Sequence, residues 1–157
     1  NGLSGVAPSL PVFSEALDEV TRALARMIVS DGEGVSRFVE VEVLGAASDK
    51  EARTAAEAIA NSTLVKCAWA GGDPNWGRVL AATGTADAKF DELNIDVKLN
   101  GIQVCKASAP AEDRSLVRFD DRLVEIEINL NAGNYTATIY TNDLTHDYVH
   151  ENSAYAT

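Results

Sequence analysis

A single carboxylate stands between two glycines in the first third of the chain. The run Asp31-Gly32-Glu33-Gly34 lets another backbone or a ligand come close to Glu33, because glycine carries no side chain. A carboxylate in that place could hold the ammonium group of an amino acid through a charge-assisted hydrogen bond. The same pattern also suits a solvated acid in a turn that ends a helix. The residue types alone leave both interpretations of Glu33 open.

A second run is Gly72-Asp73-Pro74-Asn75-Trp76-Gly77-Arg78. It combines signals of a helix start with polar and aromatic residues that are costly to place in a fold. Asp73 is a good N-cap and Pro74 fits the first helical position, so we predict a helix from about Pro74 to Ala82. Arg78 could pair with a substrate carboxylate, but an acid of the same fold is the favoured partner. Lys66 is interpreted in the same way, and we assign no catalytic role to this run.

Cysteines and histidines offer little further chemistry. Cys67 and Cys105 each lie in an apolar context, so we expect buried free thiols rather than a disulfide or metal site. His146 and His150 have the i, i+4 spacing of some helical metal ligands, but no third ligand is evident. A surface turn of helix is the prediction for the two histidines. No glycine run matches a nucleotide-binding fingerprint either. We therefore expect no metal at the two histidines and no cofactor.

The composition bounds the class of protein. At 157 residues, with 46% apolar and 24% charged residues, the chain is long enough for one globular domain with a core. A net charge of −11 argues against nucleic acid or an anionic membrane as partner, since both need clustered Lys and Arg. There is no apolar run of membrane-span length and no signal segment at the start of the sequence. We therefore expect a cytoplasmic location.

Hydrophobic periodicity predicts the elements of the first half. Apolar residues recur at helical spacing from about Pro11 to Ser30, with charged residues on the other face. Alternation over 39–43 predicts a half-buried strand. Ser48-Asp49-Lys50-Glu51 has the form of a capping box and opens a further helix. The apolar stretch from Leu64 to Ala70 suits either a strand or a buried turn of helix.

The second half is typical of antiparallel strands. Asn100-Gly101 between two alternating runs is a strong hairpin signal, because both turn residues must take positive φ. The polar segment from Pro110 to Arg122 predicts a loop. Two more alternating runs, over 124–130 and 135–140, predict a pair of strands. The fold class expected is α+β, with helices packed on one face of a mainly antiparallel sheet.

Four separated motifs together resemble one family. They are the glycine-flanked Glu33, Leu64-Val65-Lys66 followed by the Asp-Pro-Asn-Trp-Gly-Arg run, Asp143-Leu144-Thr145 with Tyr148-Val149, and the final Asn152-Ser153-Ala154-Tyr155-Ala156-Thr157. In this order and spacing they resemble the ornithine acetyltransferase (glutamate N-acetyltransferase) family of bifunctional arginine-biosynthesis proteins. The resemblance covers about Gly2 to Thr157. Within the family, these residues resemble the C-terminal part of the β chain.

The resemblance implies an acyl transfer and a substrate site. Such enzymes move the acetyl group of N-acetylornithine to glutamate through an acetyl-threonine on the N-terminal residue of the β chain, which self-cleavage exposes. The residues that match the family's substrate-binding positions are Glu33, Asn152 and Thr157. This chain starts with Asn1, so the nucleophile is expected outside it, and the chain alone is expected to be inactive. Acetyl-CoA as a further donor stays open.

The resemblance also implies partners and organisation. We expect residues 1–10 to be an entry segment from a preceding domain and residues 11–157 to form one C-terminal domain of the β chain. The expected partners are an α chain and the N-terminal part of the β chain, in an α2β2 heterotetramer. Two alternatives remain: a self-cleaving amidohydrolase or aminopeptidase of related fold, in which water accepts the acyl group, and a non-catalytic amino-acid-binding or assembly domain.

Overall fold

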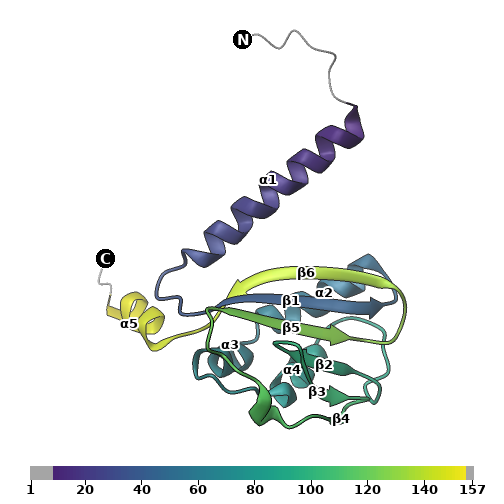
Figure 1. Ribbon diagram of the computed structural model, residues 1–157, viewed down its shortest axis with the longest axis vertical. Coiled ribbons are helices and arrows are strands. Elements are labelled where there is room, and N and C mark those ends of the chain that lie inside the picture. Colours follow the sequence, from purple (N-terminus) through teal and green to yellow (C-terminus); the bar gives the residue numbers. More distant parts are fainter. Residues whose placement is uncertain (1–8, 155–157) are drawn as a thin grey trace.

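The computed structural model describes residues 9–154, and the chain folds as a sheet with the helices of residues 49–83 packed on one face of it (Figure 1). The helices are α1 (Leu10–Ser30), α2 (Asp49–Ala60), α3 (Thr63–Ala70), α4 (Trp76–Thr83), a short 3-10 helix (Arg114–Leu116) and α5 (His146–Ala154). The strands are β1 (Phe38–Ala46), β2 (Asp96–Leu99), β3 (Ile102–Lys106), β4 (Ala109–Pro110), β5 (Leu123–Asn129) and β6 (Tyr135–Asn142).

The six strands form one sheet in the order β4-β3-β2-β5-β1-β6. Every neighbouring pair is antiparallel except β1 and β5, which run parallel with Val41 opposite Ile126. The predicted α+β class with a mainly antiparallel sheet is confirmed. The parallel pair joins strands that lie far apart in sequence, so the chain between them must cross over, and it does so through α2, α3 and α4 (Figure 1).

The core lies between α2 and the inner face of the sheet. Alternate residues of β1 face it and are fully buried, namely Val39, Val41 and Val43. Five buried residues of α2 belong to the same cluster, namely Ala52, Ala55, Ala56, Ile59 and Ala60. Four of these are alanines, so the helix can approach the strands closely. Within the described residues, no helix has both the length and the apolar character needed to cross a membrane.

Local signals placed several elements correctly. Ser48 Oγ accepts from the Glu51 amide at 3.2 Å, which confirms Ser48 as the N-cap of α2, and the Ser48 hydroxyl also lies 3.0 Å from Glu51 Oε2, to which it donates. Asn100 and Gly101 have φ of 47° and 80°, as the predicted hairpin requires. Leu64 to Ala70 is helical, the second of its two interpretations.

Two predictions need correction. The N-cap of α4 is Asn75, not Asp73, and the helix starts at Trp76 rather than Pro74. The Asp73 amide instead donates to Ala68 O at 2.8 Å and so completes the end of α3. Cys105 is buried, and burial raises the pKa of its thiol, but Cys67 is exposed because it lies on the outer face of α3. Both cysteines are free thiols, as expected.

Replacing Asn75 by alanine is expected to lower the free energy of unfolding by about 1 kcal/mol. Its Oδ1 accepts from the Arg78 amide at 3.1 Å, and alanine leaves that donor without this partner. Asn75→Ser keeps an N-cap acceptor and should stay close to wild type. Urea unfolding of the three proteins measures the effect. Equal stability of the alanine and serine variants would contradict the cap assignment.

Candidate functional site

Glu33 and Asn152 lie in contact, although 119 positions separate them in sequence. Asn152 Nδ2 donates to Glu33 Oε2 at 2.9 Å and to Tyr148 O, also at 2.9 Å. Glu33 follows the end of α1, and Asn152 lies on α5, so the loop after the first helix meets the last helix here (Figure 1). Both side chains are exposed and open to a ligand. Thr157, the third predicted site residue, lies outside the described residues.

Gly34 allows the glycine loop to lie against the backbone of α5. Its φ is +64°, in the left-handed region that favours glycine. A Cβ placed on Gly34 would lie 2.5 Å from the Tyr148 nitrogen and 2.9 Å from the Tyr148 Cα. Since both contacts are to backbone, no side-chain rotation could relieve them. Glycine at this position therefore serves the close approach that brings Glu33 to Asn152.

Thr145 joins the same two segments. Its hydroxyl donates to Gly34 O at 2.6 Å and accepts from the Tyr148 amide at 3.1 Å. The second bond is an N-cap interaction, because Thr145 directly precedes the first residue of α5. One hydroxyl thus starts α5 and ties it to the glycine loop. Sequence reasoning gave Thr145 no role, although a threonine before a helical turn is a signal that could have found the cap.

Replacing Thr145 by valine removes both of these hydrogen bonds at nearly constant volume. We expect the free energy of local opening of the loop and the first turn of α5 to fall by about 1–3 kcal/mol. Thr145→Ser retains the hydroxyl and should behave as wild type. Hydrogen exchange at Tyr148 measures the difference, and faster exchange in the serine variant than in the valine variant would contradict it.

Asp143 holds the chain just after the glycine loop. It is buried, with 4% of its surface exposed, and its Oδ1 accepts from the amides of Ser36 and Arg37, each at 3.0 Å. The Ser36 hydroxyl donates to Oδ2 of the same carboxylate. Three donors from the start of β1 therefore converge on one carboxylate at the end of β6. This anchoring role was also missed from the sequence.

Lys66 connects α3 to the same junction. Its Nζ donates to Asn142 Oδ1 at 3.0 Å and lies 3.4 Å from Thr141 Oγ1. Burial lowers the pKa of Lys66, and the nearby charge of Asp143 opposes that change. The Leu144 amide also donates to Lys66 O at 3.3 Å. Lys66 therefore has partners within the fold, although they are an amide and a hydroxyl oxygen and not the acid we expected.

The residues of the Gly72–Arg78 run bind one another and the neighbouring helix. Asn75 Nδ2 donates to Asp73 Oδ2 at 2.9 Å. Arg78 Nη1 donates to Leu64 O at 2.9 Å, which ties α4 to the start of α3. The partner of Arg78 is thus a backbone carbonyl of the same fold and not the carboxylate we expected. Nothing in the geometry assigns this run to a ligand.

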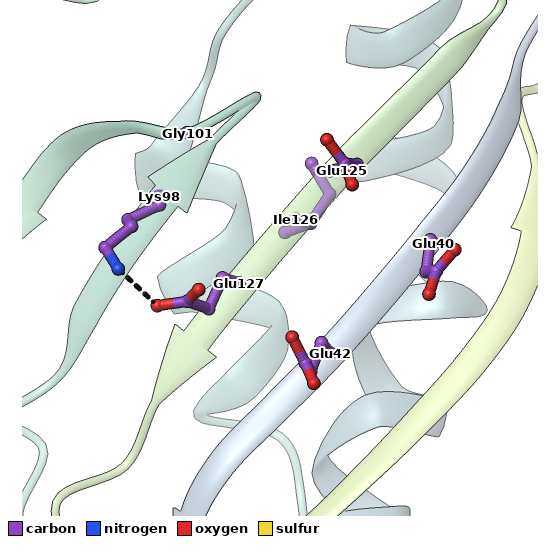
Figure 2. A pocket seen from close by; sticks show the side chains of 7 residues that line it. All are labelled: Glu40, Glu42, Lys98, Gly101, Glu125, Ile126 and Glu127. Carbon is purple, nitrogen blue, oxygen red and sulfur yellow. Dashed lines mark ion pairs between the residues drawn. The ribbon is translucent and has the colours of Figure 1, made fainter.

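The outer face of the sheet is acidic. Glu40 and Glu42 of β1 lie beside Glu125 and Glu127 of β5, around a shallow hollow of about 150 Å³ (Figure 2). Lys98 pairs with Glu127 at 2.7 Å. Within residues 9–154 no group of His, Cys, Asp or Glu is arranged to hold a metal ion, and His146 and His150 lie on α5. The glutamates therefore form a charged surface on this face of the sheet.

Comparison with known proteins decides the family. The ArgJ family profile matches residues 1–157, the whole chain. The chain belongs to the ArgJ family. This is the family of bifunctional arginine-biosynthesis proteins that the four sequence motifs resemble, so that prediction is confirmed.

Individual ArgJ relatives agree over the full length of this chain. It is 48% identical over 157 residues to the arginine biosynthesis bifunctional protein ArgJ of Thermobifida fusca and 49% identical over 156 residues to that of Streptomyces coelicolor. The alignments cover 100% and 99% of this chain but 41% of each relative. The chain thus spans about two fifths of the length of these ArgJ proteins.

A solved ArgJ structure has the same fold. The crystal structure of arginine biosynthesis bifunctional protein ArgJ from Bacillus halodurans matches with a TM-score of 0.88 and 37% sequence identity. The match covers 94% of this chain and 71% of the solved chain. The uncovered 6% of this chain is fewer residues than α1 contains, so the ArgJ structure includes at least part of that helix.

Proposed function

We propose that this chain is one part of an acetyltransferase that moves the acetyl group of N-acetylornithine to glutamate. The contact between Glu33 and Asn152 is the observation that supports the proposal. It joins two of the three residues that the family resemblance assigns to substrate binding, across 119 positions. A chance resemblance at two separated positions would give no reason for the two side chains to meet.

The Glu33 carboxylate would accept hydrogen bonds from an ammonium group of the amino-acid substrate. The Asn152 amide donates to one oxygen of that carboxylate, so it orients Glu33 and leaves the other oxygen for the substrate. Asn152 also has a carbonyl oxygen, a second acceptor for the same ammonium group. N-acetylornithine keeps a free ammonium group at the end of its side chain, because its α-amino group is acetylated, and glutamate carries an α-ammonium group. One pair of residues can therefore bind an ammonium group of each substrate in turn.

The chemical step requires a nucleophile outside this chain. A threonine hydroxyl attacks the acetyl carbonyl of N-acetylornithine, its proton passes to the leaving amine, and ornithine departs. The amino group of glutamate then attacks the acetyl-threonine, and N-acetylglutamate leaves while the hydroxyl regains its proton. The proposed partners are an α chain and the N-terminal part of the β chain, in an α2β2 assembly in the cytoplasm. Acetyl-CoA is a possible second donor.

Intact-mass spectrometry of the full-length ArgJ polypeptide tests the proposal. After incubation with N-acetylornithine we expect one added acetyl group on the fragment that contains this chain, and glutamate should remove it. Loss of the acetyl group to water but not to glutamate would favour the hydrolase. No adduct on an uncleaved polypeptide would favour a binding module. Acetyl transfer by residues 1–157 alone would contradict the proposal directly.

A further inference from the structure

The apolar side of α1 is uncovered in this chain. Five large side chains at helical spacing form a stripe along it, and each has between 48% and 66% of its surface exposed: Phe13, Leu17, Val20, Leu24 and Met27. None of the 21 residues of α1 is buried. The helix extends away from the sheet and touches it only near its C-terminal end (Figure 1). A contiguous stripe of five exposed, large apolar side chains marks an interaction site.

The stripe points away from the rest of the described chain. Arg26 turns toward the sheet, since its guanidinium lies 3.0 Å from Glu40 Oε2 and 5.0 Å and 5.1 Å from the ring centres of Phe38 and Tyr140. Leu24 precedes Arg26 by two residues, a rotation of about 200° around a helix. The side that meets the sheet is therefore the polar side, and the apolar stripe is on the opposite side.

Turning the helix over would not cover the stripe either. The sheet surface on the α1 side carries Glu40, Glu42, Glu125 and Glu127 (Figure 2). Placing Leu17 or Leu24 on that surface would take carboxylates out of water and would separate Glu40 from Arg26, which is costly. The partner of the stripe must therefore come from outside the residues that the structure describes.

We infer that the apolar stripe of α1 is a docking surface for the remaining part of the ArgJ polypeptide, the part that this chain lacks. The ArgJ relatives extend well beyond the 41% that this chain matches, so they contain enough additional sequence for a further apolar layer. The solved ArgJ chain likewise contains residues beyond the 71% that is matched. A second copy of this chain is the competing occupant.

Docking of α1 also bears on the substrate site. Glu33 comes three residues after the last residue of α1, and Gly34 ties that loop to α5. The helix therefore connects the additional layer to the segment that carries Glu33. This part of the inference rests on the proposed function, whereas the docking itself does not require any activity.

Cysteine labelling of the full-length ArgJ polypeptide tests the surface. Leu24→Cys places a thiol on the stripe, and Ala25→Cys places one on the next residue, about 100° around the helix and exposed in this chain. Iodoacetamide labelling in native buffer, mapped by peptide mass spectrometry, should be at least tenfold slower at position 24 than at position 25. In urea the two rates should become equal.

Each other outcome overturns the inference. Equal native labelling at the two positions would mean that nothing covers the stripe. Protection that disappears when dilution separates the protein into single copies would identify a second copy as the occupant. Neither readout depends on acetyl transfer, so an inactive protein with a protected position 24 would contradict the proposed function and leave the docking surface supported.

Discussion

Glu33→Gln in the full-length ArgJ polypeptide is expected to lower kcat/KM for both N-acetylornithine and glutamate by about 10- to 100-fold. A hydrogen bond to a charged group contributes about 1.5–3 kcal/mol, and the amide keeps the shape of the side chain but not its charge. Both substrates should be affected, because N-acetylornithine would present its side-chain ammonium group and glutamate its α-ammonium group to the same carboxylate. Steady-state kinetics with each substrate varied in turn measure the loss.

Glu125→Gln is the matched control for this charge removal. Glu125 lines the hollow on the acidic face of the sheet, which neither Glu33 nor Asn152 lines, and its replacement should leave both kcat/KM values unchanged (Figure 2). Asn152→Ala should be non-additive with Glu33→Gln, since the two side chains share a hydrogen bond of 2.9 Å. Unchanged kinetics in Glu33→Gln, in a protein that assembles normally, would remove Glu33 from the site.

Gly34→Ala is expected to destabilise the loop by about 3–5 kcal/mol and to abolish most of the activity. The substitution combines an unfavourable φ of +64° with a Cβ only 2.5 Å from the Tyr148 nitrogen. The loop and α5 must then separate, which moves Glu33 away from Asn152. Hydrogen exchange at residues 145–149, together with kcat/KM, measures the two consequences.

Gly72→Ala separates the cost of the positive φ from the cost of the close contact with Tyr148. Gly72 has the same φ of +64°, but no atom lies within 4 Å of the position that its Cβ would take. We therefore expect a cost of about 1–2 kcal/mol from the backbone conformation alone. If the two alanine variants were equally stable, the close approach of Gly34 to α5 would not be the reason for glycine there.

Local sequence signals determined most of the elements. The helix of residues 10–30, the N-cap at Ser48 and the hairpin turn at Asn100-Gly101 each depend on residues a few positions apart, so a single sequence can predict them. The start of α4 was predicted two residues early. Asp73 and Asn75 are both good N-caps, and the structure decides for Asn75, whose Oδ1 accepts from the Arg78 amide.

The exposure of Cys67 depends on which side of a short helix meets the core. In α3 the buried residues are Val65, Ala68 and Trp69, and Cys67 faces the opposite way. An apolar neighbourhood in the sequence could not supply that direction. In the same way, the periodicity of α1 predicted an apolar face, but it could not show that nothing in this chain covers it.

By itself the sequence determined the family and the fold class, and it named two candidate site residues that lie in contact. Only the tertiary structure decided that β1 pairs in parallel with β5 and that Gly34, Thr145 and Asp143 hold the site together. The pattern of one strand identifies its buried face but not its neighbour. Pairing depends on how all the apolar faces can be buried at once, and contacts across more than a hundred positions follow from that global solution.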